Sequence, residues 1–359
     1  MDEGITAGIG LDELRDLVAL HTEAQELDPA QSARVLDRID RPWGEGAGAW
    51  GTEWAAEGDL TAAQGRHLEA SRLHAMGRFP FPGDPARVYA QQRCVAEFDQ
   101  WRREQPVRIG RLEVGSADSH AVCWTAGLSR TDRRPLLLIM GGIVSVKEQW
   151  GPLLAAAEDL GIAMVVTELP GVGENTLRYD VTAPGMLSRI LNALADRADV
   201  DRTAAVALSF GGHLALRCAV SDPRLRAIAT VGAPIRQFFE DPAWQRRLPR
   251  TTVNTLAWLT HHSPATVFGC LRGWGLDDAE LAAPGIPVRY VAALRDEIVP
   301  LGEASTLRGA VPDAAVTVFD DIHGAPAHLA QTRGLLLETA LAAFAPVPAA
   351  TAAADRSAA

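Results

Sequence analysis

The segment from Thr203 to Arg217 (TAAVALSFGGHLALR) constrains the fold more than any other part of the chain. Its first six residues, Thr203 to Leu208, are mostly small or β-branched and apolar, which is typical of a strand covered on both faces of a parallel sheet. Ser209 follows directly, and two glycines come after one more residue. The apolar residues then recur with helical spacing. A strand that turns into a helix this sharply strains the turn residue and requires small neighbours. The segment therefore predicts a nucleophile elbow with Ser209 at its tip.

The motif around Ser209 is Ala-x-Ser-x-Gly, because Ala207 stands where glycine is more usual. Alanine is the next smallest residue, so the departure is mild. The alternative is that Ser209 only caps the helix beside it, since serine is a favoured N-cap residue. The strand-turn-helix context, with an acid and then a histidine downstream, favours the nucleophile.

A serine hydroxyl is a weak nucleophile at neutral pH, so it needs a general base and an acid that orients the base. Asp296 follows the predicted strand 288–294 and is the candidate acid, with an ordinary turn residue as the alternative. Alternation is expected to point its neighbour Glu297 elsewhere. His323 follows the last predicted strand. It is favoured as the base over His328, because a loop beside a glycine can reach back over the elbow.

Acyl chemistry also needs N–H donors for a developing oxyanion. We expect them from Phe210, directly after the nucleophile, and from Gly142 in the Gly141-Gly142 pair that follows the strand 135–140. A plain strand-to-helix turn at this pair is compatible with that role. Glu240, in the segment APIRQFFED, is a further candidate acid at the rim of the site. The alternative is a surface or helix-start carboxylate.

The pattern along the chain changes near residue 105. Residues 1–105 are expected to be almost wholly helical, with one amphipathic pattern running from Leu60 to Met76. Residues 106–345 begin with an antiparallel pair and then alternate strands with helical patterns of about 10 to 15 residues, which predicts an α/β fold: a mostly parallel sheet with helices on both faces. We expect a helical lid insertion after the sixth strand, at about residues 236–284. The last residues, 346–359, are expected to be a disordered tail.

Seven of the nine tryptophans lie in the N-terminal helical region or in the expected lid. They are Trp43, Trp50, Trp54, Trp101, Trp244, Trp258 and Trp274. If both helical parts cover the carboxyl edge of the sheet, we expect some of these indoles to line an apolar, aromatic pocket above Ser209. The alternative is that they pack the two helical parts together.

Composition excludes several classes of protein. A net charge of −11 and a pI near 5.3 argue against nucleic-acid binding. The N-terminus, MDEGITAGIG, lacks the features of a signal peptide, and no run of 18 apolar residues occurs, so we expect a cytoplasmic protein without membrane contact. Four scattered cysteines, without a CxxC motif or zinc spacing, are expected to be buried thiols. We expect neither a metal nor a cofactor.

With these residues in place, the chain resembles the α/β-hydrolases. Within them it is similar to the branch of FrsA-like esterases, fungal pigment polyketide-shortening hydrolases and dihydroxypseudooxynicotine hydrolases. The resemblance rests on the helical N-terminal region with its FPFPGDP junction, the segment GGIVSVKE (Gly141 to Glu148), the elbow, Asp296 and His323. It implies a serine hydrolase for esters or for carbon–carbon bonds beside a ketone, often in secondary metabolism and frequently a homodimer. An acid near Glu240 also resembles one used by the carbon–carbon hydrolases. Ala207 and the lid sequence depart from the family pattern.

The leading hypothesis is a cofactor-free hydrolase in which Ser209 attacks a carbonyl, His323 carries the proton and Asp296 orients His323. The expected substrate is a hydrophobic small molecule, such as a polyketide-like natural-product intermediate. One alternative is that the same triad eliminates an acyl group and leaves an alkene. Another is a non-catalytic ligand-binding protein on a hydrolase fold, against which the intact serine, acid and histidine weigh.

Overall fold

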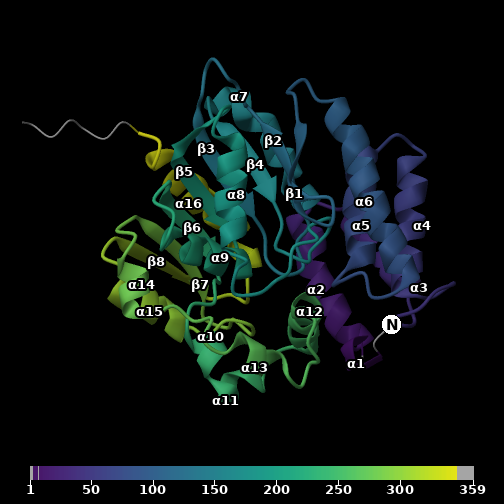
Figure 1. Ribbon diagram of the computed structural model, residues 1–359. Coiled ribbons are helices and arrows are strands. Elements are labelled where there is room, and N and C mark those ends of the chain that lie inside the picture. Colours follow the sequence, from purple (N-terminus) through teal and green to yellow (C-terminus); the bar gives the residue numbers. More distant parts are fainter. Residues whose placement is uncertain (1–2, 7, 346–359) are drawn as a thin grey trace, which may run out of the picture.

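The computed structural model describes residues 3–6 and 8–345, whose centre is one eight-stranded sheet (Figure 1). The strands are β1 (Gly110–Ser116), β2 (Ser119–Ala126), β3 (Pro135–Met140), β4 (Ala163–Thr167), β5 (Asp199–Ala207), β6 (Leu225–Val231), β7 (Val288–Ala293) and β8 (Ala314–Phe319). Their order across the sheet is β1-β2-β4-β3-β5-β6-β7-β8. Strand β2 is antiparallel to both of its neighbours, and all other pairs are parallel. The mostly parallel sheet and the antiparallel pair at its start confirm the predicted fold class.

Side-chain alternation buries the central strands on both faces, because successive residues of a strand point to opposite sides. On β3, Leu136 and Leu138 join the apolar cluster that contains α8 (Gly185–Leu194) and α9 (Phe210–Ala219). Leu137 and Ile139 join the cluster that contains α7 (Ala157–Leu160) and α16 (Leu329–Ala342). The helices that follow the strands are α7 (Ala157–Leu160), α8 (Gly185–Leu194), α9 (Phe210–Ala219), α15 (Gly302–Ala310) and α16 (Leu329–Ala342), with short 3-10 turns at Lys147–Gln149, Gly151–Ala156 and Pro326–His328. The continuous apolar run PLLLIM is therefore explained by helices on both sides of the sheet.

The part of the chain before the sheet is helical, as predicted. It forms α1 (Glu3–Thr6), α2 (Leu11–Ala24), α3 (Pro29–Arg38), α4 (Trp50–Ala62), α5 (His67–Arg78) and α6 (Pro85–Arg103), with α4 to α6 beside the β1 edge of the sheet in Figure 1. One expectation is wrong: the pattern from Leu60 to Met76 is not one helix. The chain breaks between α4 and α5, where Gly65 takes a φ of +75°, and the Leu60 side chain is 63% exposed.

Five short helices lie between β6 and β7. They are α10 (Gln237–Glu240), α11 (Pro242–Gln245), α12 (Arg250–Thr260), α13 (Val267–Leu271) and α14 (Asp278–Ala282). An aromatic stack joins α12 to the N-terminal helices, since Trp258 lies parallel to Phe81 at 5.0 Å between ring centroids and Trp43 lies 5.4 Å from Phe81. Trp50 and Trp54 are fully buried within the N-terminal helices. These tryptophans pack the helical parts, which was the alternative interpretation.

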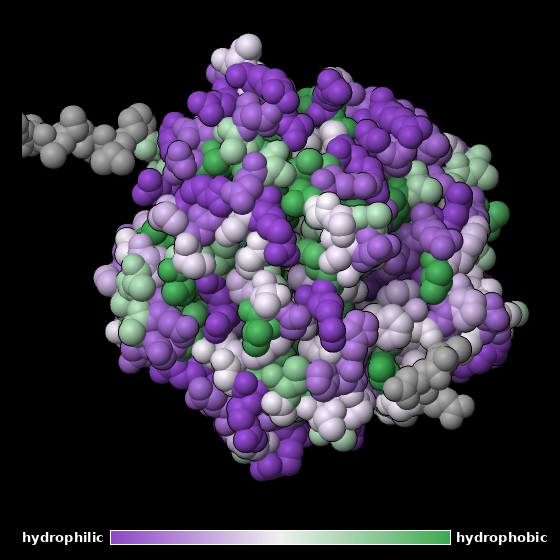
Figure 2. All heavy atoms as spheres, viewed as in Figure 1, coloured by the Kyte–Doolittle hydropathy of each residue, from purple (hydrophilic) through white to green (hydrophobic). Residues whose placement is uncertain are grey.

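The view in Figure 2 is mainly hydrophilic, with apolar residues in small separate groups. Among the helices of the described residues, none combines the length and the apolar character needed to cross a membrane. The cysteines are unpaired, and Cys94, Cys123 and Cys218 are buried. Burial raises the pKa of the Cys218 thiol to about 11. The prediction of buried thiols is confirmed for these three and is wrong for Cys270, which is only partly buried.

The tail expected at 346–359 lies outside the described residues.

Candidate active site

Ser209 occupies the sharp turn between β5 and α9. Its backbone has φ 52° and ψ −128°, a conformation that costs a residue with a side chain about 1–3 kcal/mol. Two hydrogen bonds hold the turn: the N–H of Ser209 donates to the carbonyl oxygen of Val231 (2.8 Å), and that of Leu208 to the carbonyl oxygen of Met140 (2.9 Å). A Cβ atom on Gly211 would lie only 2.5 Å from the carbonyl oxygen of Gly141. The elbow predicted from the sequence is present, and its glycine is required by close backbone packing.

His323 joins Ser209 to Asp296. Its Nε2 atom lies 3.0 Å from Ser209 Oγ, and its Nδ1 atom lies 2.9 Å from Asp296 Oδ2 and 3.0 Å from Asp296 Oδ1. The chain reaches this arrangement from the ends of three parallel strands, β5, β7 and β8, which meet at one edge of the sheet. These distances suit proton transfer from the hydroxyl to the imidazole.

Asp296 is a buried carboxylate held by hydrogen bonds to His323 and to its own loop. Its Oδ1 atom accepts the N–H groups of Ile298 (2.9 Å) and Val299 (2.7 Å), and its side chain is 4% exposed. It thus combines a turn-stabilising role with its contact to His323.

His328 lies outside the cluster. Its Nδ1 atom is 2.9 Å from Asp321 Oδ2, and its ring stacks on Phe319 at 4.3 Å between centroids. Of the two histidines weighed as the base, the structure places His323 beside Ser209.

Two carboxylates set the protonation of His323. Burial opposes the charged imidazole, but Asp296 and Glu297 outweigh it and raise the pKa of His323 above its usual value. The N–H of His323 also donates to Glu297 Oε2 (3.1 Å), and Glu297 lines the cavity at Ser209. The expectation that Glu297 points away is wrong, because the chain turns after β7 and strand alternation no longer applies there.

Glu240 is not part of this arrangement. It is exposed at the end of α10, where its carboxylate lies near Gly275, and it does not line the cavity at Ser209. The structure places Glu297, and not Glu240, beside His323 at the cavity of Ser209.

The position of Glu297 predicts a change in the pH profile. A general base must be neutral, so kcat/KM is expected to fall as the pH drops through the pKa of His323. Glu297→Gln removes one of the charges that raise this pKa. The acid limb of its pH profile, where kcat/KM falls as the pH drops, is therefore expected at lower pH than in the wild type. Measuring kcat/KM on a chromogenic ester from pH 5 to pH 9 checks the shift.

Glu240→Gln is the matched control for this measurement and is expected to leave the limb in place. If the acid limb of kcat/KM shifts in Glu240→Gln and does not shift in Glu297→Gln, then Glu240, and not Glu297, is the additional acid.

The Gly141-Gly142 loop approaches the elbow from the end of β3. A Cβ atom on Gly142 would lie 3.0 Å from Ser209 Cβ and 3.4 Å from Ser209 Oγ, so the backbone of Gly142 borders the hydroxyl directly. Phe210 is the first residue of α9, and the N–H groups of the first helical turn have no acceptor within the helix. Both predicted oxyanion donors therefore lie beside Ser209.

A buried ionic cluster lies in the segment that follows this loop. The ammonium group of Lys147 lies 2.8 Å from Glu148, 3.1 Å from Glu168 and 2.7 Å from Glu174. Glu168, at the end of β4, also accepts the backbone N–H of Lys147 (3.0 Å) and of Glu174 (2.8 Å). No role for these residues was predicted from the sequence, although charged residues inside otherwise apolar segments (GGIVSVKE and VVTELPG) were a visible signal.

A cavity of about 190 Å³ opens above Ser209. Its walls come from α2, the Gly141-Gly142 loop, α12 and the His323 loop, and apolar side chains make up most of them. Among the described residues that line it there is no lysine or arginine, and Glu297 is its one carboxylate. Trp150 is its one tryptophan, so the predicted tryptophan lining from the two helical parts is wrong.

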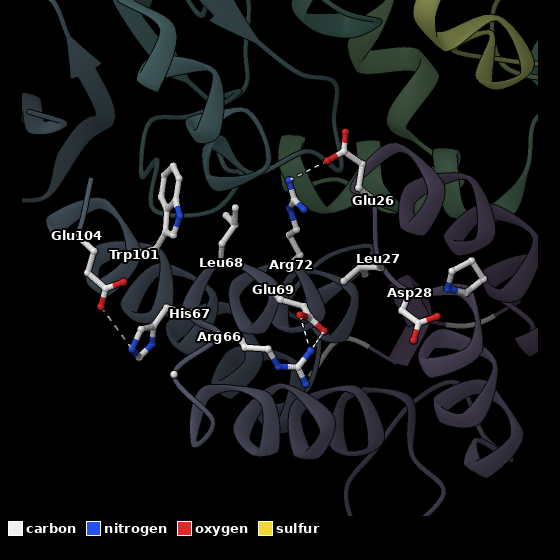
Figure 3. A pocket seen from close by; sticks show the side chains of 12 residues that line it. Glu26, Leu27, Asp28, Arg66, His67, Leu68, Glu69, Arg72, Trp101 and Glu104 are labelled. Atoms are coloured by element: carbon white, nitrogen blue, oxygen red, sulfur yellow. Dashed lines mark hydrogen bonds and ion pairs between the residues drawn. The ribbon is translucent and has the colours of Figure 1, made fainter. Parts of the chain in front are cut away.

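A larger hollow of about 630 Å³ lies on the N-terminal helices and shares no residue with the cavity at Ser209. Figure 3 shows three pairs among its side chains: Arg66 with Glu69, Arg72 with Glu26, and His67 with Glu104. Its size does not make it the candidate active site, because Ser209 and His323, the candidate nucleophile and base, line the smaller cavity.

The strand order, the elbow and the serine–histidine–aspartate geometry define an α/β-hydrolase. The family model of the FrsA-like esterases matches residues 21–268. The chain belongs to the FrsA-like esterase family.

Two curated relatives illustrate the distance within this family. Esterase FrsA of Klebsiella pneumoniae is 27% identical over 275 residues, which are 70% of this chain and 64% of that protein. Hydrolase acrC of Aspergillus aculeatus is 28% identical over 259 residues, which are 62% of this chain and 59% of that protein. The matched region thus spans less than two thirds of the length of these relatives.

Two solved structures match most of the chain. AbyA5 is 48% identical with a TM-score of 0.89, covering 93% of this chain and 94% of that one. The 2,6-dihydroxy-pseudo-oxynicotine hydrolase is 18% identical with a TM-score of 0.71, covering 92% and 98%. This second likeness shows a shared fold.

Proposed function

We propose that this protein is a serine-dependent hydrolase that cleaves an ester, or a carbon–carbon bond beside a ketone, in a neutral hydrophobic molecule such as a polyketide-like intermediate. The observation that carries the proposal is the pair of contacts made by His323, 3.0 Å to Ser209 Oγ and 2.9 Å to Asp296 Oδ2. The apolar cavity without a lysine or arginine among its described lining residues supports a neutral substrate.

In this mechanism Ser209 Oγ attacks the substrate carbonyl carbon while His323 Nε2 takes the hydroxyl proton. Asp296 stabilises the imidazolium, and the N–H groups of Gly142 and Phe210 bind the oxyanion. The imidazolium then gives its proton to the departing oxygen or carbon. Water, deprotonated by His323, attacks the acyl-enzyme and releases the acid together with free Ser209.

The helices around the cavity are the candidate lid. Thr251 and Thr252 of α12 and Leu17 and Leu20 of α2 line the cavity. We propose that the region 236–284 and the N-terminal helices of 1–105 together form the lid over the hydrolase core of 106–345. The cytoplasmic location expected from the sequence and the homodimer that the family resemblance implies belong to the same proposal, and light scattering after size-exclusion chromatography tests the dimer.

Covalent labelling tests the activated serine. Incubation with a fluorophosphonate is expected to add one adduct to the intact mass of the wild type and none to Ser209→Ala. An unlabelled wild type would contradict the proposal.

Turnover in ¹⁸O-labelled water then separates hydrolysis from acyl elimination by the same triad. Hydrolysis places solvent oxygen in the released acid, whereas direct elimination does not.

A further inference from the structure

His21 is a second histidine in the wall of the cavity at Ser209. It lies in the last turn of α2, and with Leu17, Leu20 and Ala24 of the same helix it lines the cavity. Its ring packs against Phe79 at 5.1 Å between centroids. Helix α2 thus brings one polar ring to a wall that is otherwise mainly apolar on this side.

The surroundings of His21 keep its imidazole neutral. Burial lowers the pKa of His21 to about 4, and the positive charges of Arg78 and of protonated His323 lower it as well. Arg78 is itself buried and donates to the carbonyl oxygen of Val144 (2.6 Å), and it does not line the cavity. At neutral pH, His21 therefore presents one N–H donor and one nitrogen acceptor.

These two groups have no partner among the residues that the structure describes, where no hydrogen bond or ion pair reaches the His21 ring. His323, by contrast, uses both ring nitrogens, one for Ser209 and one for Asp296. A polar ring that faces a mainly apolar cavity without a protein partner leaves its hydrogen bonds to a ligand.

We propose that His21 is a positioning residue that hydrogen-bonds a second uncharged oxygen of the substrate, a carbonyl or a hydroxyl, while the first carbonyl lies at Ser209. The inference rests on the proposed function and deepens it. It names the substrate class as an apolar molecule with a second neutral oxygen near the reacting carbonyl. A carboxylate or phosphate does not fit, because Glu297 lines the cavity and no described lining residue is a lysine or arginine.

A matched pair of ligands tests this assignment. Heptane-2,4-dione and heptan-2-one differ by one carbonyl in place of a methylene, and isothermal titration calorimetry gives the Kd of each. The measurements use Ser209→Ala, so that neither ketone is turned over. The dione is expected to bind about tenfold more tightly than the monoketone, the strength of a net neutral hydrogen bond. In Ser209→Ala/His21→Leu the preference is expected to fall to about twofold or less.

Ser209→Ala/Glu23→Leu is the control, because Glu23 is exposed on the same helix and outside the cavity; its preference for the dione is expected to be unchanged. His21→Gln, which keeps a donor and an acceptor, is expected to restore part of the preference. His21→Phe serves as a second apolar variant, with thermal melting as the check on folding.

An equal affinity for both ketones in Ser209→Ala, no binding of either, or an unchanged preference after His21→Leu would overturn the role of His21. The result does not depend on a reactive serine, since the nucleophile is absent. Failure of fluorophosphonate labelling contradicts the proposed function, and failure of the dione preference contradicts the inference about His21.

Discussion

Ser209→Ala is expected to reduce kcat/KM on a neutral ester by at least about 10⁴-fold, because it deletes the atom that forms the covalent bond. The rest of the site stays in place: His323 keeps its contacts with Asp296 at 2.9 and 3.0 Å, and the N–H groups beside the elbow are backbone groups. Alanine at φ 52° bears the same backbone strain as serine, so the melting temperature is expected to change little. Steady-state kinetics and thermal melting measure the two effects.

Ser209→Gly is the informative companion variant. Glycine tolerates the conformation of the elbow, so this variant is expected to be as inactive as Ser209→Ala but more stable by about 1 kcal/mol. A higher stability of Ser209→Gly than of Ser209→Ala would show that the backbone at the turn is strained, and that this strain accompanies the placement of the Ser209 hydroxyl. Activity of Ser209→Ala within tenfold of the wild type would contradict the assignment of the nucleophile.

Lys147→Met is expected to lower the free energy of unfolding by about 3–5 kcal/mol at neutral pH. The Lys147 side chain is 0% exposed and is the shared partner of Glu148 and Glu168, whose side chains are 1% and 0% exposed. Removing the cation leaves these carboxylates buried without their shared compensating charge. Such carboxylates either pay a large desolvation penalty or take up protons. Urea denaturation of the wild type and the variant gives the difference.

The loss of unfolding free energy in Lys147→Met is also expected to become smaller as the pH falls. Burial already raises the pKa of Glu168 to about 7 in the wild type, and removing Lys147 raises it further. A carboxyl whose pKa is higher in the folded state than in the unfolded state destabilises the fold above the folded-state pKa. That penalty is lost as the pH falls toward the unfolded value. Denaturation at pH 7.5 and at pH 5.5 should therefore show a larger effect of the substitution at pH 7.5.

Arg111→Met is the control for the ionic cluster. Arg111 contacts Glu174 at 2.9 Å, but its side chain is 32% exposed and water can replace it, so we expect a loss of at most about 1 kcal/mol. Equal losses in the two variants, or a loss in Lys147→Met that is independent of pH, would contradict the role of Lys147 as the compensating charge of a buried cluster.

Much of the site follows from local patterns. The elbow at Ser209 needs only a strand, a sharp turn and a helix, all encoded within one short segment. Asp296 and His323 were identified by their positions after predicted strands, because the carboxyl ends of parallel strands meet at one edge of the sheet. The residues that local rules placed wrongly stand where the chain leaves a regular element: Glu297 lies in the turn after β7, where alternation no longer predicts direction, and Leu60 lies just before the break between α4 and α5.

The sequence by itself predicted the α/β class, the succession of strands along the chain and the positions of Ser209, Asp296 and His323 directly after strands, because periodicity and turn chemistry act over a few neighbouring residues. Only the tertiary structure decided what surrounds them. His21 lines the cavity from a helix almost two hundred positions before Ser209. Lys147 contacts Glu168, which follows a separate strand. The tryptophans Trp43, Trp50, Trp54 and Trp258 pack the helical parts. Such contacts depend on how distant elements pack, and no local pattern in the chain encodes that packing.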